Sequence, residues 1–131
     1  MVITNEILDE LTEKAKASVR LRMNFDLRNS AEDNSQRMLN AMEPGTVLPI
    51  HRHRSTSEVV IILRGSIKQH VYDSTGVETE CVLLDAKGDI RCMTVPTGQW
   101  HRAESLEPGT VIFEAKDGKY EPLAPEDILN D

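Results

Sequence analysis

The most informative segment of the sequence is Gly45-Thr-Val-Leu-Pro-Ile-His51-Arg-His53-Arg-Ser-Thr-Ser-Glu58-Val-Val-Ile-Ile-Leu-Arg-Gly65. Alternate residues of a strand point to the same face, so His51 and His53 are expected to project together, with the intervening arginine pointing away. Glu58 follows a short polar turn that can bring its carboxylate back toward the two imidazoles. The apolar run at residues 59–63 is far shorter than the roughly 20 residues of a membrane span and predicts a core strand.

A second segment, Pro96-Thr-Gly98-Gln-Trp-His101, places a tight turn just before a third histidine. Three imidazole nitrogens and one carboxylate oxygen suit a divalent first-row metal and leave positions open for water or substrate. The sequence therefore predicts one divalent transition-metal ion per chain, Fe, Mn, Zn or Ni. The expected metal ligands are His51, His53, Glu58 and His101.

The spacing of Gly45, His51, His53, Glu58 and Gly65 resembles the first cupin motif at every fixed position. The second cupin motif is met in part, since Pro96, Gly98 and His101 fit. Its leading glycine, if Gly88, comes two residues early, and Ser105 stands where asparagine is expected. The resemblance implies a jelly-roll barrel that binds a metal ion.

A narrower resemblance, to the WbuC family of cupin-fold metalloproteins, covers nearly the whole chain. It rests on the polar strand at residues 20–24, the run at 34–45, the His51-Arg-His53 motif, the segment at 96–101 and the ending at 114–122. That family is found with bacterial O-antigen and surface-polysaccharide biosynthesis genes. The resemblance implies a sugar-related context and supplies no substrate.

Around these motifs the chain reads as one mainly β domain with a short N-terminal helix. Residues 1–18 are expected to form the helix, with Thr4 as its cap and Ile3 packed against Leu8. Hydrophobic residues alternate from Val19 to Arg28, which predicts a half-buried strand. Turn residues then recur through residue 118, so the second expected segment, 19–131, is a cupin-type jelly-roll β-barrel domain.

Composition limits the partners. The chain has 131 residues and a net charge of −7, which argues against nucleic acid as a partner. The N-terminus lacks an apolar signal region, so we expect a cytoplasmic protein with no membrane partner. Cys81 and Cys92 are expected to be buried, reduced and inert. Open sheet edges and the apolar surface of the helix predict a homodimer.

Several polar residues are candidates for contacting a small-molecule ligand, anionic or carbohydrate. Arg20, Arg22 and Asn24 share one face of the first predicted strand, where they either are solvated or bind a phosphate or carboxylate. Asn40 is expected to be a buried polar group, satisfied either by the protein or by ligand in the barrel lumen.

Other residues have a plainer expected role. His70 fits neither motif and is expected to be an exposed or satisfied strand histidine, while Trp100 is expected in the core or a dimer contact. The WbuC resemblance alone singles out Glu114, Lys116 and Tyr120, for which a charged solvent-facing strand is the favoured interpretation.

Two functions of different class remain open. The first is a metalloenzyme, isomerase-like or epimerase-like, acting on a carbohydrate or sugar-nucleotide intermediate with the metal as Lewis acid. Such chemistry needs a general base, and the sequence offers no obvious one, so the catalytic residues are unassigned. The alternative is a non-catalytic metal-dependent module that binds or senses an anionic sugar. A structural metal or oxygen activation at iron are lesser options.

Overall fold

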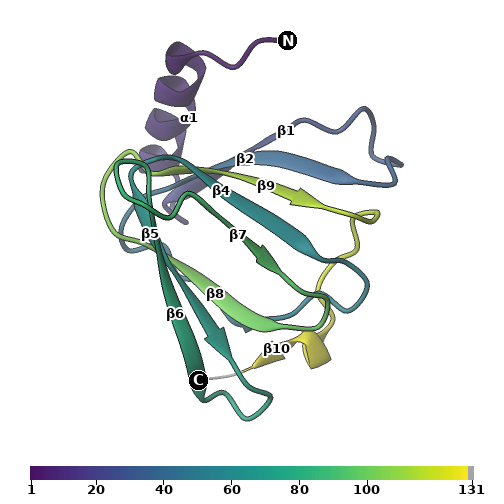
Figure 1. Ribbon diagram of the computed structural model, residues 1–131. Coiled ribbons are helices and arrows are strands. Elements are labelled where there is room, and N and C mark those ends of the chain that lie inside the picture. Colours follow the sequence, from purple (N-terminus) through teal and green to yellow (C-terminus); the bar gives the residue numbers. More distant parts are fainter. Residues whose placement is uncertain (130–131) are drawn as a thin grey trace.

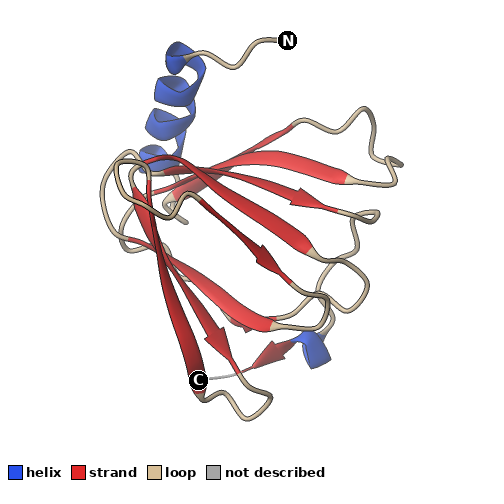
Figure 2. Ribbon diagram, in the orientation of Figure 1, coloured by secondary structure: helices blue, strands red, loops and turns tan. Residues whose placement is uncertain are grey.

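The computed structural model describes residues 1–129, in which two five-stranded antiparallel sheets face each other (Figures 1 and 2). The last two residues of the predicted 19–131 domain lie outside the described residues. The first sheet has the order β1 (Arg22–Asp26), β2 (Gln36–Met42), β9 (Val111–Lys116), β4 (Glu58–Arg64), β7 (Cys92–Val95). The second has the order β10 (Ile128–Leu129), β3 (Ile50–His51), β8 (Trp100–Ser105), β5 (Ser66–Tyr72), β6 (Glu78–Asp85). This jelly roll, together with the helix α1 (Asn5–Ala17) and the short 3-10 helix η1 (Pro125–Asp127), confirms the predicted mainly β fold class.

Helix α1 covers part of the outer face of the first sheet (Figure 1). It begins as predicted, because the side chain of the cap residue Thr4 accepts a hydrogen bond from the Ile7 N–H at 3.3 Å. Its apolar stripe is buried against strand residues of β2 and β9; the cluster contains Leu8, Leu11, Ala15, Leu39, Ala41 and Val111. The apolar face of the helix is therefore covered by its own chain.

The predicted strand at residues 19–28 is wrong at its beginning. Val19 is fully exposed, and β1 begins only at Arg22. After the helix, a turn is closed by a hydrogen bond from the Leu21 N–H to the Ser18 carbonyl at 3.0 Å, and Leu21 itself has a φ of +57°. A left-handed residue cannot continue an alternating strand, so the hydrophobic alternation before Arg22 is accidental.

Gly65, the last residue of the first motif, is required by the closeness of two chain segments. It has a φ of +73°, and a Cβ at this position would lie 2.3 Å from Thr110 Oγ1. Only glycine lets the β4–β5 turn approach the segment that leads into β9.

The space between the sheets is divided into two regions. An apolar cluster fills one region: Met42, Val60, Ile62, Ile67, Leu84 and Ile112. The other holds a polar pocket. Trp100 lies on the outer face of the second sheet, buried with Ile50 and Tyr72, which confirms its predicted core position.

The cysteine prediction is wrong, because Cys81 and Cys92 are both exposed free thiols. Each lies on an edge strand, β6 and β7 respectively, and an edge strand has a neighbour on only one side to cover its outer face. None of the helices within residues 1–129 is long and apolar enough to cross a bilayer.

Candidate functional site

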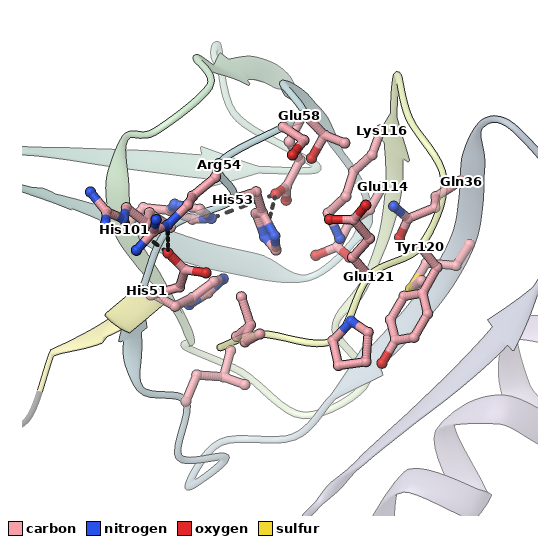
Figure 3. Close-up of a pocket in the computed structure, with 18 of the residues that line it drawn as sticks. Gln36, His51, His53, Arg54, Glu58, His101, Glu114, Lys116, Tyr120 and Glu121 are labelled. Carbon is pink, nitrogen blue, oxygen red and sulfur yellow. Dashed lines mark hydrogen bonds and ion pairs between the residues drawn. The ribbon is translucent and has the colours of Figure 1, made fainter. Parts of the chain in front are cut away.

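The polar pocket has a volume of about 630 Å³, within the range of small-molecule sites. Both sheets contribute to its wall, and the segment at residues 119–127 lies along it. Figure 3 shows His51, His53 and His101 on one side of the pocket. Glu114, Lys116 and Tyr120 lie on the other side in the same view.

The three predicted metal-ligating histidines converge. Strand β3 pairs with β8 so that His51 lies directly opposite His101, with their ring centroids 4.4 Å apart. His53 comes two residues after His51, and its ring centroid is 5.1 Å from that of His51. The Gly98 N–H donates to the His53 carbonyl at 2.8 Å, so the second motif holds the first in place.

Glu58 begins β4 and completes the cluster. Its Oε2 lies 3.6 Å from His53 Nε2 and 3.5 Å from His101 Nε2. The side chain is buried, and this oxygen has no hydrogen-bond partner in the described part of the chain. A buried carboxylate oxygen without a partner costs free energy, and a bound cation would offset that cost.

Backbone carbonyls fix the orientation of two of the rings. The carbonyl of Pro49 accepts from His51 Nδ1 at 2.9 Å, and that of Gln99 accepts from His101 Nδ1 at 2.8 Å. A carbonyl only accepts, so the proton of each neutral ring lies on Nδ1 and the Nε2 lone pair is left for a ligand. This is the usual support of a metal-binding histidine.

The electrostatic environment favours neutral rings at two of the positions. Burial, helped by the charge of His101, lowers the pKa of His51 to about 4. Burial and the charge of Lys116 lower the pKa of His53 to about 4. Burial acts in the same direction at His101, but the adjacent Glu58 carboxylate outweighs it and raises the pKa of that ring.

The pKa of Glu58 is also shifted. Burial alone would raise it, but the contact with His101 and the charge of Lys116 hold it well below its ordinary value. Glu58 is therefore an anion at neutral pH. Ligand nitrogens of His51, His53 and His101 lie within 4.8 Å of one another, and with the Glu58 oxygen they fit a divalent transition-metal ion.

The predicted ligand-contacting residues lie around the same pocket. Arg20, Arg22, Asn24 and Asn40 all line it. In the register of β1 with β2, Asn24 is paired with Asn40, so both side chains lie on the inner face of the sheet. Asn40 Oδ1 is buried and has no hydrogen-bond partner among residues 1–129. The structure thus brings Arg22 and Asn24 of β1, and Arg20 of the turn before it, to the same cavity as the histidine cluster.

Three residues that were expected to face solvent line the pocket. Glu114 and Lys116 on β9 line the cavity and are half-buried, so the solvent-facing interpretation is wrong for them; Tyr120, beyond β9, also lines the cavity but is 53% exposed. Strand β9 is central in its sheet, between β2 and β4, and its register places Lys116 opposite Glu58. Burial and the negative charge of Glu58 raise the pKa of Glu114 above its ordinary value.

A second group of pocket residues has no signal in the sequence. Asp127 of η1 forms ion pairs with Arg52 Nε at 3.1 Å and Arg54 Nε at 2.5 Å. These contacts hold the C-terminal segment against the pocket wall. They join residues more than 70 positions apart, a separation that no local pattern predicts.

Comparison with known proteins identifies a family and a fold. The model of one protein family, described as a domain of unknown function (DUF6016), matches residues 3–84. None of the curated protein sequences compared with the chain matches it.

Solved structures resemble the chain at low sequence identity. KdgF from Halomonas sp. matches with a TM-score of 0.61 and 16% identity over 76% of this chain and 82% of its own. The capsular polysaccharide assembling protein CapF from Staphylococcus aureus gives a TM-score of 0.64 and 17% identity, over 80% of this chain and 30% of its own. Oxalate oxidase in complex with the substrate analogue glycolate gives a TM-score of 0.64 and 11% identity, over 83% of this chain and 57% of its own. The match confirms the predicted cupin jelly roll.

Proposed function

Because this chain belongs to the family described as domain of unknown function DUF6016, whose description assigns no activity, we propose its function from the site itself. The proposal is a metal-dependent enzyme that moves a proton on an anionic carbohydrate or sugar-nucleotide intermediate. The reaction class is isomerisation or epimerisation, in the context of surface-polysaccharide biosynthesis that the resemblance to the WbuC family implies.

His51, His53, Glu58 and His101 would hold the metal ion. A divalent ion bound there would supply Lewis-acid stabilisation of negative charge on a substrate oxygen. The partnerless Glu58 Oε2 and the Nε2 lone pairs of two carbonyl-anchored rings support this assignment.

The observation that carries the enzyme proposal is the position of Glu114. This carboxyl is half-buried, lines the same pocket as the histidine cluster, and is close enough to Glu58 and His101 to interact with both electrostatically. The raised pKa of Glu114 brings its two protonation states closer in free energy at neutral pH, which suits a group that must both take and return a proton. Glu114 is therefore the proposed general acid or base, for which the sequence alone offered no candidate.

The charge of the pocket supports an anionic substrate. Six basic and five acidic side chains line the pocket, in a chain whose overall charge is negative: Arg20, Arg22, Arg52, Arg54, Lys116 and Lys119 against Glu58, Glu114, Glu121, Glu126 and Asp127. Arg52 and Arg54 are engaged by Asp127, whereas Arg20 and Arg22 form no ion pair with a carboxylate of the described residues. Two such guanidinium groups suit a phosphate or a carboxylate.

Hydrogen exchange with solvent tests the proposal without knowledge of the product. The protein, reconstituted with Mn²⁺ in D₂O, is incubated with a panel of sugar nucleotides, sugar phosphates and uronic acids, and loss of carbon-bound proton signals is followed by NMR. We expect exchange in at least one compound. Glu114→Gln should slow it by roughly 10²-fold or more, the usual contribution of a general acid or base, while metal content stays unchanged. Arg28→Ala is the matched control, because Arg28 is held outside the pocket by Asp26.

The alternative function is a non-catalytic module that binds or senses an anionic sugar. It is favoured by the same basic lining, and it needs no group that transfers a proton. Binding of panel compounds without any solvent exchange at carbon would support this alternative and contradict the enzyme.

A further inference from the structure

A second group of metal-ligating side chains lies on the outer face of the second sheet. His70 of β5 is directly opposite Cys81 of the edge strand β6. Glu78 enters from the start of β6, beyond a register shift at Val71 and Tyr72. The ligand atoms of His70, Glu78 and Cys81 lie within 4.8 Å of one another, the same limit that the inner histidine cluster satisfies.

This outer cluster is separate from the inner pocket. Gln69 lines the pocket, and side chains alternate along β5, so His70 points to the other side of the sheet. None of the three residues of the outer cluster lines the pocket. An ion bound in the outer cluster would therefore share no ligand with one in the inner cluster.

The orientation of His70 is fixed by carboxylates. Its Nε2 is 2.9 Å from Glu104 Oε1 on β8, and its Nδ1 is in close contact with Glu78 Oε1. An ionised carboxylate only accepts, so Nε2 carries a proton and donates it to Glu104. Glu78 likewise only accepts, so without a metal Nδ1 donates to Glu78, and a bound ion would replace that proton between Nδ1, the Glu78 carboxylate and the strand that carries Cys81. A metal-ligating histidine commonly donates its other ring N–H to a carboxylate, which fixes the orientation of the ring.

We propose that the outer cluster is a second metal site, which takes a borderline divalent ion such as zinc. The ligands are His70 Nδ1, a Glu78 carboxylate oxygen and the Cys81 thiolate, and Glu104 is a positioning residue. A sulfur, nitrogen and oxygen set favours zinc-like ions, whereas the inner set of nitrogen and oxygen also suits manganese and iron. This site goes beyond the proposed function and does not depend on it.

The charges around the cluster support a cation. Glu78, Glu104 and a Cys81 thiolate supply up to three negative charges. Two positive side chains share this face: Arg102 of β8 lies opposite His70 and donates to Tyr72 Oη at 3.2 Å, and Lys68 of β5 lies opposite Glu104. The competing interpretation is a protonated His70 that simply bridges Glu78 and Glu104, in which Cys81 has no role.

Cobalt binding separates the two interpretations. Titration of the reduced full-length protein with Co²⁺ should give a near-ultraviolet sulfur-to-cobalt charge-transfer band that saturates at one equivalent of thiolate-bound metal. Cys81→Ser should abolish this band. Cys92→Ser is the matched control, an exposed cysteine on the other sheet's edge strand, and should retain it.

Two further variants test the named roles. His70→Gln should remove the band, while Glu104→Gln should retain it and weaken cobalt affinity by roughly 10-fold to 100-fold. All variants should keep the wild-type circular dichroism spectrum, since the changes are on an outer face. Absence of the band in the wild type, or its persistence in Cys81→Ser, would overturn the proposal. Failure of the solvent-exchange test above leaves this result unaffected, because no thiolate lies in the inner pocket.

Discussion

The metal-binding capacity of the inner histidines depends on their hydrogen-bond partners as much as on their own positions. Carbonyls of Pro49 and Gln99 set the tautomers of His51 and His101, and Glu58 is held between two Nε2 atoms. We therefore expect about one Mn²⁺ per chain after reconstitution, with His101→Ala removing most of it. Elemental analysis after gel filtration measures this, and Arg28→Ala should retain the ion. Metal-free wild-type protein after reconstitution would contradict the assignment.

The lowered pKa values of His51 and His53 predict how the metal-free protein responds to acid. Both are about 4 in the folded chain and near 6.5 in the unfolded one. Between these values the unfolded chain binds protons that the folded chain does not, so stability falls as pH falls through this window. We expect a loss on the order of 3 kcal/mol between pH 6.5 and about pH 5, roughly 1.5 kcal/mol from each ring, since one pKa unit is worth about 1.4 kcal/mol.

Urea denaturation of chelator-treated protein at the two pH values measures this loss. The variant His53→Gln should lose less stability than the wild type, because one of the two groups no longer titrates. The raised pKa of His101 acts in a different range: its contribution is present below 6.5 and is lost as pH rises through its folded value. Equal stability of the wild type at both pH values would show that the rings are solvated.

Arg22 is the residue on which anion recognition is expected to depend most. It lines the pocket, and burial together with the charge of Arg20 lowers its pKa, against an opposing effect of the Glu114 carboxylate. Replacing Arg22 by alanine should weaken binding of a sugar phosphate by about 1.5–3 kcal/mol and leave metal content unchanged.

Calorimetric titration with glucose 1-phosphate measures the effect. Arg28→Ala is the control from the segment after β1, because Arg28 does not line the pocket and its Nε and Nη2 donate to Asp26. Its guanidinium lies 5.7 Å from the ring centroid of Tyr120, at the edge of the pocket. Equal affinity of the Arg22 variant and the wild type would show that Arg22 is solvated and does not contact the bound anion.

At the scale of elements, α1 and the segment after it show which hydrophobic residues matter. Leu11 is buried between the helix and the first sheet, whereas Val19 is fully exposed in the turn that follows. Leu11→Ala should destabilise the protein by about 2–5 kcal/mol through lost burial and a cavity. Val19→Ala should change the free energy of unfolding by less than about 0.5 kcal/mol. Urea denaturation compares them; a large effect of Val19→Ala would mean that this turn is packed in solution.

The elements that could be predicted from sequence are those specified locally. The cap at Thr4, the helix and the strand that begins at Glu58 carry their own periodicity and turn residues. The position of Glu114 could not be predicted, because a charged residue on a strand usually faces solvent. Whether it does so here depends on β9 pairing with β2 on one side and β4 on the other, which is a property of the topology.

The same reasoning explains the histidine cluster and its C-terminal neighbour. His51 and His53 could be predicted to converge because they lie two residues apart, and His101 was added to the set because a tight turn at residues 96–98 comes just before it. The contact of Asp127 with Arg52 and Arg54 requires that β10 pair with β3, two short strands at an edge whose pairing leaves no mark in composition.

At the scale of the whole molecule, charge is distributed unevenly. The chain carries a net charge of −7, yet six of its Lys and Arg side chains line one cavity. Five carboxylates also line this cavity, but Arg20 and Arg22 form no ion pair among the described residues and attract anions that reach them. An acidic surface repels anions in general, so the arrangement favours selection of a small anion over a polyanion.

Assembly is the last property of the whole molecule that the sequence raised, and we still expect a homodimer. The apolar face of α1 needs no partner, because its own sheet covers it. The apolar surface available for a dimer interface is the outer face of β4 and β7, where Leu63 is 40% exposed beside half-buried Val59 and Ile61. Exposed Cys92 and Thr94 of the edge strand β7 continue this face. A copy related by a two-fold axis would cover the apolar strip with the same strip.

Light scattering at roughly tens of micromolar protein should therefore give a dimer mass, and Leu63→Asp should shift the population to monomer, because a carboxylate would be buried without a partner. Val47→Asp is the control: Val47 is 86% exposed in the loop before β3, away from the strip, and its substitution should leave the dimer intact. A dimer that survives Leu63→Asp would move the interface to another surface, with the edge strand β6 the next to test. A monomeric wild type would mean that the strip is only the ordinary apolar share of a protein surface.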